Sequence, residues 1–93
     1  MIVSFRSKAL RRYWEKSDAR GLRPDWIARS SRLRNALDTA SRPEDMNVPG
    51  FALHALTGDL ADRFALTVAR NWRVTFSWSG DDAAEIDLED YHG

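Results

Sequence analysis

The apolar residues change their spacing part-way along the chain, after Pro49-Gly50. Before this point they recur every three or four residues, which is typical of helices that bury one side. After it they alternate with polar residues, most clearly where Trp72, Val74, Phe76 and Trp78 are separated by Arg73, Thr75 and Ser77. Alternation sends successive side chains to opposite faces of a strand. The sequence therefore predicts an α+β fold in which helices precede a sheet.

The part before the change predicts two helices. Ser7 can cap the first helix, and Gly21 is expected to end it. Pro24 suits the first turn of the second helix, which should end near Ala40 because Ser41-Arg42-Pro43 breaks helices. The larger side chains expected to face the core are Leu10, Tyr13 and Trp14 of the first helix and Trp26, Leu33 and Leu37 of the second.

The part after the change predicts an antiparallel meander, with strands over residues 51–54, 63–68, 72–78 and 84–88. Arg70-Asn71 allows a tight hairpin, and Ser79-Gly80-Asp81-Asp82 predicts a second turn. Ile2 to Phe5 can add a short edge strand. Because each element has one apolar face, we expect the two N-terminal helices to pack on one face of a small antiparallel sheet.

Length and composition limit the classes of protein. A chain of 93 residues suits one domain spanning residues 1–93. The chain has no cysteine, which excludes a disulfide framework, a Cys-ligated zinc and a thiol nucleophile. No apolar run approaches the roughly 20 residues needed to span a bilayer. The opening residues also lack a signal-peptide pattern, so a cytoplasmic location is expected.

The formal net charge of zero hides an uneven distribution of charge along the chain. Residues 1–42 carry 11 basic and 4 acidic side chains, a net +7, whereas residues 43–93 carry 3 and 10, a net −7. Of the 14 basic residues, 12 are arginine, which favours bidentate contacts to phosphate or carboxylate. The split indicates a basic surface for a polyanion or an acidic partner, although a solvated helix face is the simpler interpretation.

Histidine is scarce, and both histidines are candidate acid–base groups. His54 lies in a predicted strand, and His92 follows Asp90-Tyr91 at the end of the sequence. Arg73 is expected on the polar face of its strand, where it can contact a phosphate. A structural histidine, a frayed end and a solvated arginine are the simpler interpretations. The histidines lack metal-ligand spacing, and the sequence has no phosphate-binding loop or Gly-x-Ser-x-Gly elbow.

Several segments together match the motifs of one family. The sequence opens on Ile2-Val3-Ser4-Phe5-Arg6 with Lys8 and Leu10, continues through Leu53-His54-Ala55-Leu56-Thr57-Gly58-Asp59 and Asn71-Trp72-Arg73-Val74-Thr75-Phe76, and closes on Asp90-Tyr91-His92. In these segments, and over nearly its whole length, the chain resembles the HigB toxins of bacterial type II toxin–antitoxin systems. These toxins are a branch of the RelE-like (RelE/ParE) ribonucleases.

The resemblance implies a RelE-like fold and a toxin that cleaves mRNA on the ribosome. Cleavage would use acid–base chemistry and the RNA 2′-hydroxyl, without a metal or organic cofactor. The residues that match the family's site are His54, Arg73, Asp90, Tyr91 and His92. The implied partners are a HigA-type helix-turn-helix antitoxin and, through the toxin–antitoxin complex, operator DNA. No membrane interaction is expected.

One position departs from the family pattern. Thr57 stands where the family has a lysine, which would add a cation near the RNA backbone. Its loss is expected to weaken phosphate binding or slow the reaction. An alternative is therefore a catalytically weakened protein that mainly binds its antitoxin and acts as a co-repressor on operator DNA. A free-standing RNA-binding domain is disfavoured, because the strand aromatics align with the predicted core.

Overall fold

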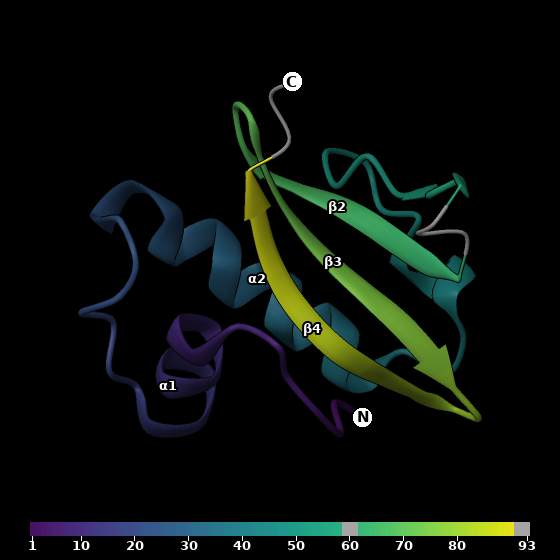
Figure 1. Ribbon diagram of the computed structural model, residues 1–93, viewed down its shortest axis with the longest axis horizontal. Helices are drawn as coiled ribbons and strands as arrows, with labels where there is room; N and C mark the ends of the chain where they lie inside the picture. Colours follow the sequence, from purple (N-terminus) through teal and green to yellow (C-terminus); the bar gives the residue numbers. More distant parts are fainter. Residues whose placement is uncertain (59–61, 91–93) are drawn as a thin grey trace.

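The fold consists of a small antiparallel sheet and two helices (Figure 1). The computed structural model describes residues 1–58 and 62–90. The elements in chain order are α1 (Lys8–Lys16), the 3₁₀ turn η1 (Pro24–Trp26), α2 (Ile27–Thr39), the 3₁₀ turn η2 (Pro43–Met46), β1 (His54–Ala55), β2 (Arg63–Ala69), β3 (Trp72–Ser79) and β4 (Asp82–Asp90). The strands pair antiparallel in the order β1-β2-β3-β4. This confirms the α+β class and the predicted meander.

The first helix begins where the sequence predicts but ends earlier. The Ser7 hydroxyl accepts a hydrogen bond of 3.1 Å from the Leu10 backbone N–H, which satisfies one open donor at the helix start. The helix ends before Ser17, which adopts a left-handed conformation with φ of 57°. The prediction that Gly21 ends this helix is therefore wrong. Gly21 instead lies against α1, where a Cβ atom would come 2.9 Å from Cβ of Ala9.

The second helical segment matches the prediction at both ends. Pro24 opens η1, which continues directly into α2, and Ala40 ends α2 in an extended conformation. Trp26 is 6% exposed, and its ring centroid lies 4.8 Å from that of Trp72. This contact joins the start of the second helical segment to the start of β3, and it confirms the prediction that Trp26 is a core residue.

The two hairpins of the meander form at the predicted turns. Asn71, with φ of 66°, and Gly80, with φ of 62°, adopt left-handed conformations between successive strands. Tight hairpins require such conformations. Between β2 and β3, Leu66 lies opposite Val74, and both side chains are fully buried. The predicted alternation therefore gives β2 and β3 one apolar face and one polar face.

The first strand is shorter than the predicted strand over residues 51–54. β1 contains only His54–Ala55. Ala52 has a left-handed φ of 55°, which interrupts an extended chain. Phe51 is nevertheless buried, at 3% exposed, and its carbonyl accepts a 2.9 Å hydrogen bond from the Thr67 N–H of β2. The segment before β1 thus covers the edge of β2 without forming a regular strand.

A bulge breaks the alternation that the sequence predicts for the last strand. Glu85 has φ of 53°, and the pairing between β3 and β4 shifts at this point. Before the bulge, Ala83 pairs with Trp78 and Ala84 pairs with Ser77. Ala84 therefore lies on the polar face, and its predicted place on the apolar face is wrong.

The helices and the sheet share one core. Its fully buried members come from helices, loops and strands, and they include Leu10, Leu33, Leu37, Met46, Leu66, Val74, Phe76 and Ile86. In Figure 1, α2 lies behind the sheet, whereas α1 lies beside the β4 edge. The expectation that both helices cover one face of the sheet alike is therefore too simple. In the described part of the chain, no helix is long and apolar enough to cross a membrane.

The N-terminal segment occupies the outer edge of β4. Bridges join Ile2 to Ala83 and Phe5 to Ile86 in parallel orientation. The Val3 N–H donates to the Ala83 carbonyl over 2.9 Å. The segment lies where the sequence predicts an edge strand, although isolated bridges form instead of a continuous ladder.

The helix cap gives a first testable prediction. Ser7→Ala removes the acceptor of the Leu10 N–H and should lower the free energy of unfolding by about 1 kcal/mol. Urea unfolding followed by circular dichroism measures this difference. Ser79→Ala, at the exposed end of β3, is the matched control and should change stability by less than about 0.5 kcal/mol. Equal stability of Ser7→Ala and the parent would contradict a stabilising role of the cap.

Candidate functional site

The polar face of the sheet carries side chains from all of its strands. The register aligns His54, Ala65, Thr75 and Asp87 in one row across β1 to β4. The neighbouring row contains Thr67, Arg73 and Glu89. Directly opposed residues of antiparallel strands share a face, and so do residues two apart in one strand. His54 of β1 and Arg73 of β3 are therefore on the same face of the sheet.

His54 is exposed on the edge strand, and the backbone engages one of its ring nitrogens. Its Nδ1 lies 3.0 Å from the carbonyl oxygen of Ala52. Because a carbonyl oxygen can only accept, Nδ1 carries the proton in this contact, and Nε2 is the unprotonated nitrogen of the neutral ring. This is the tautomer that a base acting through Nε2 requires.

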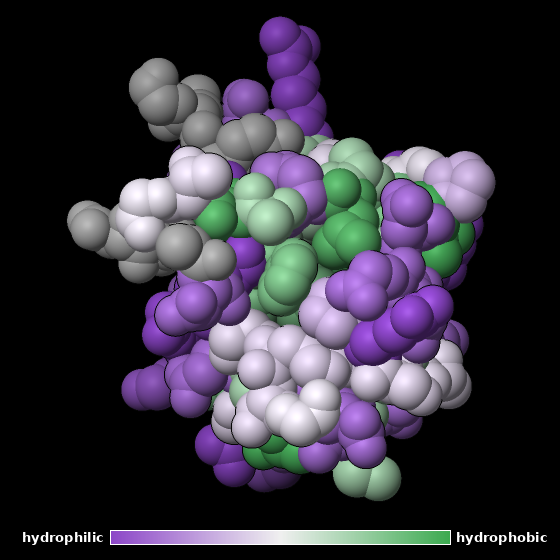
Figure 2. All heavy atoms as spheres, turned by 90° about the vertical axis from the view of Figure 1, so that its right-hand side faces the viewer, coloured by the Kyte–Doolittle hydropathy of each residue, from purple (hydrophilic) through white to green (hydrophobic). Residues whose placement is uncertain are grey.

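An open pocket of about 250 Å³ adjoins His54. The residues around it come from η2, β1, β2 and the loop before β1, and they are Pro43, Glu44, Asn47, Leu53, Ala55 and Phe64. Figure 2 looks onto this side of the molecule, where apolar atoms are exposed between polar ones. The volume is below the range usual for sites that enclose a small-molecule ligand. The pocket is better suited to contact part of a larger partner.

Arg73 is half-buried on β3, between polar neighbours on both adjacent strands. Thr67 of β2 and Glu89 of β4 lie directly opposite it. The sequence prediction that Arg73 lies on the polar face of its strand is confirmed. Its half-buried position leaves the Arg73 guanidinium fewer orientations than a fully exposed arginine would have.

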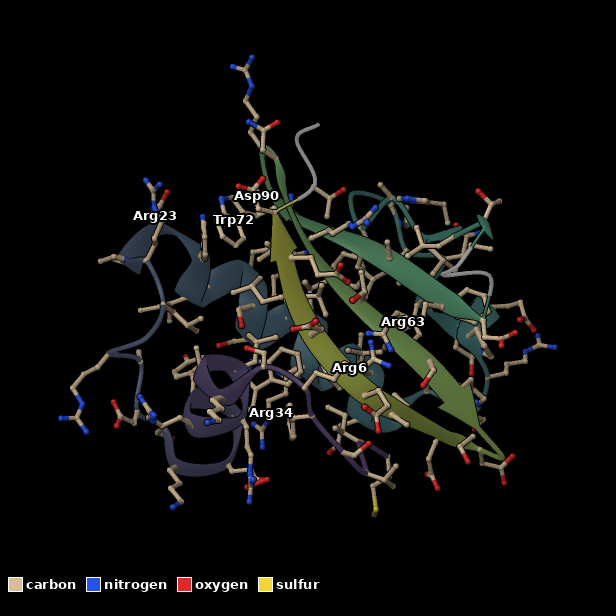
Figure 3. The ribbon with its side chains drawn as sticks, viewed as in Figure 1. Arg6, Arg23, Arg34, Arg63, Trp72 and Asp90 are labelled. Carbon is tan, nitrogen blue, oxygen red and sulfur yellow. The ribbon has the colours of Figure 1, made fainter. Side chains whose placement is uncertain are left out.

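The predicted residues at the end of the chain are only partly within the described structure. Asp90 ends β4 and lies opposite Trp72, so it is on the other face of the sheet from Arg73; Figure 3 shows it beside Trp72. It is exposed and directly follows the residue opposite Arg73. Tyr91 and His92 lie outside the described residues, and their place in the site stays a prediction.

The polar face also contains a buried arginine that the sequence pattern does not predict. Arg63, the first residue of β2, is only 5% exposed. Its Nη2 donates to the Thr75 hydroxyl over 2.9 Å and to the Glu85 carbonyl over 2.7 Å. Thr75 in turn donates to a carboxylate oxygen of Glu89. The alternation of polar and apolar residues predicts only that Arg63 lies on the polar face. It does not predict that the side chain is buried there.

Charges near Arg63 shift the pKa of its guanidinium in opposite directions. Burial lowers the pKa of its guanidinium, and the positive charge of Arg6 lowers it further. The carboxylates of Glu89, Asp87 and Glu85 act against this shift. Because arginine keeps its proton at physiological pH, Arg63 is a buried cation near several carboxylates. Figure 3 shows Arg6 and Arg63 on the same side of the sheet. Among the described residues, no group of acidic or histidine side chains could hold a metal ion.

Basic side chains cover the exposed side of α1. Lys8, Arg11, Arg12 and Lys16 are exposed and surround a surface hollow together with Glu15. Glu15 pairs with Arg11 at 3.4 Å, so the helix face keeps a net positive charge. Within the basic half of the sequence, α1 thus presents a basic surface.

Comparison with known proteins agrees with the motifs. A family model described as the RelE-like toxin of type II toxin–antitoxin system HigB matches residues 3–92. The chain belongs to this family. One curated relative, Endoribonuclease HigB of Proteus vulgaris, is 36% identical over 92 residues, which are 99% of this chain and 100% of the relative. The HigB family resemblance seen in the sequence is confirmed.

The exposure of His54 predicts that its removal leaves the fold intact. His54→Ala should change the free energy of unfolding by less than about 0.5 kcal/mol, as measured by chemical denaturation. Phe51→Ala provides the contrast, because this neighbouring side chain is 3% exposed. Phe51→Ala should lower the free energy of unfolding by about 3–5 kcal/mol. A comparable loss in His54→Ala would mean that the histidine is structural.

Proposed function

We propose that this chain is the toxin of a type II toxin–antitoxin system and acts as a ribosome-dependent endoribonuclease that cleaves mRNA and inhibits translation. The family match over residues 3–92 carries the proposal. The curated name of the relative from Proteus vulgaris, Endoribonuclease HigB, supports it. The polar face of the sheet supports it further, because it contains a histidine and an arginine of the kind this chemistry uses.

RNA can be cleaved through its own 2′-hydroxyl. A base removes the hydroxyl proton, the 2′-oxygen bonds to the adjacent phosphorus, and the bond from phosphorus to the 5′-oxygen of the next nucleotide breaks. An acid protonates the leaving 5′-oxygen, which leaves a 2′,3′-cyclic phosphate and a 5′-hydroxyl. The protein must supply the base, the acid and a cation for the crowded phosphate.

His54 suits the role of the base. Its Nδ1 is engaged by the backbone, which leaves Nε2 to accept the 2′-hydroxyl proton. Its exposure lets an RNA strand approach without movement of the core. Arg73, on the same face, suits the cation that stabilises charge on the phosphate. Asp90, Tyr91 and His92 complete the proposed set. We assign the acid to Tyr91 or His92, because Asp90 lies on the other face of the sheet from Arg73.

The basic face of α1 favours a ribosome-bound mode of action. Its cations, Lys8, Arg11, Arg12 and Lys16, can follow RNA phosphates without reading sequence. We propose a HigA-type helix-turn-helix antitoxin as the partner that keeps the toxin inactive. Operator DNA is then a ligand of the toxin–antitoxin complex. The proposed reaction uses no metal or organic cofactor, and it takes place in the cytoplasm.

A second candidate function rests on Thr57. This residue is exposed in the loop after β1, at the position where the family pattern has a lysine. Without that cation, the positive charge at the proposed site comes mainly from Arg73. A chain weakened in this way would act mainly as an antitoxin-binding co-repressor. Growth arrest on induction without antitoxin separates the two functions.

The acid–base set predicts large losses of activity. His54→Ala, Tyr91→Phe and His92→Ala should each slow cleavage of ribosome-bound mRNA by about 10²–10⁴-fold, the usual contribution of one positioned acid or base. Primer extension on message from programmed ribosomes measures the rate. Asp81→Asn, in the exposed turn before β4, is the control and should cleave like the parent.

Two outcomes would contradict the proposal. A parent chain that neither arrests growth nor cleaves ribosome-bound message would favour the co-repressor function. Normal cleavage by both His54→Ala and His92→Ala would show that the reaction uses other residues.

The departure at Thr57 predicts a gain of activity. An exposed ion pair contributes up to about 1 kcal/mol, so Thr57→Lys should raise kcat/KM by up to about fivefold. The gain should shrink as the salt concentration rises. Thr39→Lys, which adds the same charge at the exposed end of α2, is the matched control. The same gain in both variants would show that net charge, not this position, is responsible.

A further inference from the structure

The turn before β1 holds the carbonyl group that His54 contacts. Ala52 has a left-handed φ of 55°, and its carbonyl oxygen lies 3.0 Å from Nδ1 of His54. A left-handed conformation is uncommon for alanine, and a residue in such a conformation persists only where the surrounding structure holds it. The position of this carbonyl therefore depends on the contacts that the rest of the turn makes.

Phe51 anchors the turn to the core and to the sheet. Its side chain is only 3% exposed. Its N–H donates to the Val48 carbonyl over 3.0 Å, and its own carbonyl accepts from the Thr67 N–H of β2 over 2.9 Å. The residue directly before Ala52 is thus tied both to the preceding chain and to a central strand.

Two arginines of α2 contact the same turn. Nη1 of Arg29 donates to the Gly50 carbonyl over 2.9 Å, and the guanidinium of Arg32 lies 5.8 Å from the centroid of the Phe51 ring. Residues three apart on a helix are neighbours on its surface, so both arginines project from one side of α2. Gly50 has φ of 92°, and glycine can leave this conformation at little cost. A contact that fixes the Gly50 carbonyl therefore restricts how the turn can pivot.

Neutralisation of charge does not account for these two contacts. Arg23, just before η1, pairs with the Asp25 carboxylate at 3.3 Å. Within residues 1–58 and 62–90, Arg29 and Arg32 form no ion pair of this kind. Their contacts are instead to a backbone carbonyl and to an aromatic ring of the turn. These two cations thus act on the turn and not on a neighbouring carboxylate.

The Ala52 carbonyl selects one form of the His54 ring. A neutral imidazole carries its proton on either nitrogen, and a carbonyl oxygen accepts only from the nitrogen that carries it. With Nδ1 protonated, Nε2 keeps its lone pair and can remove a proton from another group. If the Ala52 carbonyl moved away, the ring would also adopt the tautomer protonated on Nε2, which cannot act as a base through that atom.

We propose that Arg29, assisted by Arg32, is a positioning residue for His54: by holding the turn at residues 50–52, it keeps the Ala52 carbonyl against Nδ1 and so keeps Nε2 unprotonated. The proposal rests on the proposed function, in which His54 is the base. In this role Arg29 contacts neither the transferred proton nor the phosphate. Its effect reaches His54 through the backbone of the turn.

The first test follows the tautomer of His54 and does not depend on activity. The NMR resonances of its two ring nitrogens, assigned by their loss in His54→Ala, distinguish a protonated from an unprotonated nitrogen at a pH where the ring is neutral. Arg29→Gln should shift the tautomer equilibrium toward protonated Nε2 by about 2- to 10-fold, the equivalent of one net hydrogen bond. Arg29→Lys keeps a charged donor and should shift the equilibrium less. Arg34→Gln, which removes the same charge from an exposed position of α2, is the matched control and should leave the resonances unchanged.

The second test measures cleavage of ribosome-bound mRNA. Only one tautomer is competent, so kcat of Arg29→Gln should fall with the fraction of His54 in that tautomer, by roughly 2- to 5-fold. KM of Arg29→Gln and of Arg34→Gln should agree, because both variants lose one positive charge from α2. Arg32→Gln should lower kcat less than Arg29→Gln does, since a cation–π contact of an exposed side chain is weak.

The outcomes separate this proposal from the proposed function. If Arg29→Gln leaves the His54 resonances at their parental positions, the positioning role is wrong, whatever happens to activity. If the tautomer shifts but His54→Ala cleaves normally, His54 is not the base, and the positioning by Arg29 stands. Equal losses of kcat in Arg29→Gln and Arg34→Gln, without a shift of the tautomer, would assign both arginines to RNA binding and overturn the proposal.

Discussion

The bulge at Glu85 is the constraint on which both faces of the sheet depend. If Glu85 belonged to a regular ladder and not to a bulge, the pairing that places Ala83 opposite Trp78 would continue along β4. A slip of one residue sends every following side chain to the opposite face. Asp87 would then lie opposite buried Val74, in the core. The bulge therefore decides which acidic side chains of β4 reach the polar face.

Much of the fold follows from signals that act over a few residues. Ser7 and Pro24 mark helix starts because a cap and a fixed φ operate locally. Asn71 and Gly80 mark hairpins because they accept left-handed conformations readily. Glu85 gives no such signal, since a positive φ is uncommon for this residue. Contacts from β2 and from the N-terminal segment hold it there, and these contacts come from distant parts of the chain.

Two residues of the candidate site, His54 and Arg73, could be predicted from the sequence motifs and from the alternation of polar and apolar residues. The motifs point to His54 and Arg73, and alternation places Arg73 on the polar face. The tautomer of His54 was not predictable, because it depends on the left-handed turn at Ala52. The burial of Arg63 was not predictable either. A polar residue in an alternating strand is expected to face water, whereas Arg63 is buried and donates to groups on β3 and β4 that are distant in sequence.

The pairing of the N-terminal segment with β4 also sets an order of events during folding. Residues 2–5 pair with residues 83–86, near the opposite end of a chain of 93 residues. Contacts so distant in sequence close large loops and form late. On a ribosome that is synthesising this chain, the edge of β4 cannot close until residue 86 has been added. Residues 2–5 thus stay unpaired until residues 83–86 have been made, and the bulge that aligns the polar face can be completed only then.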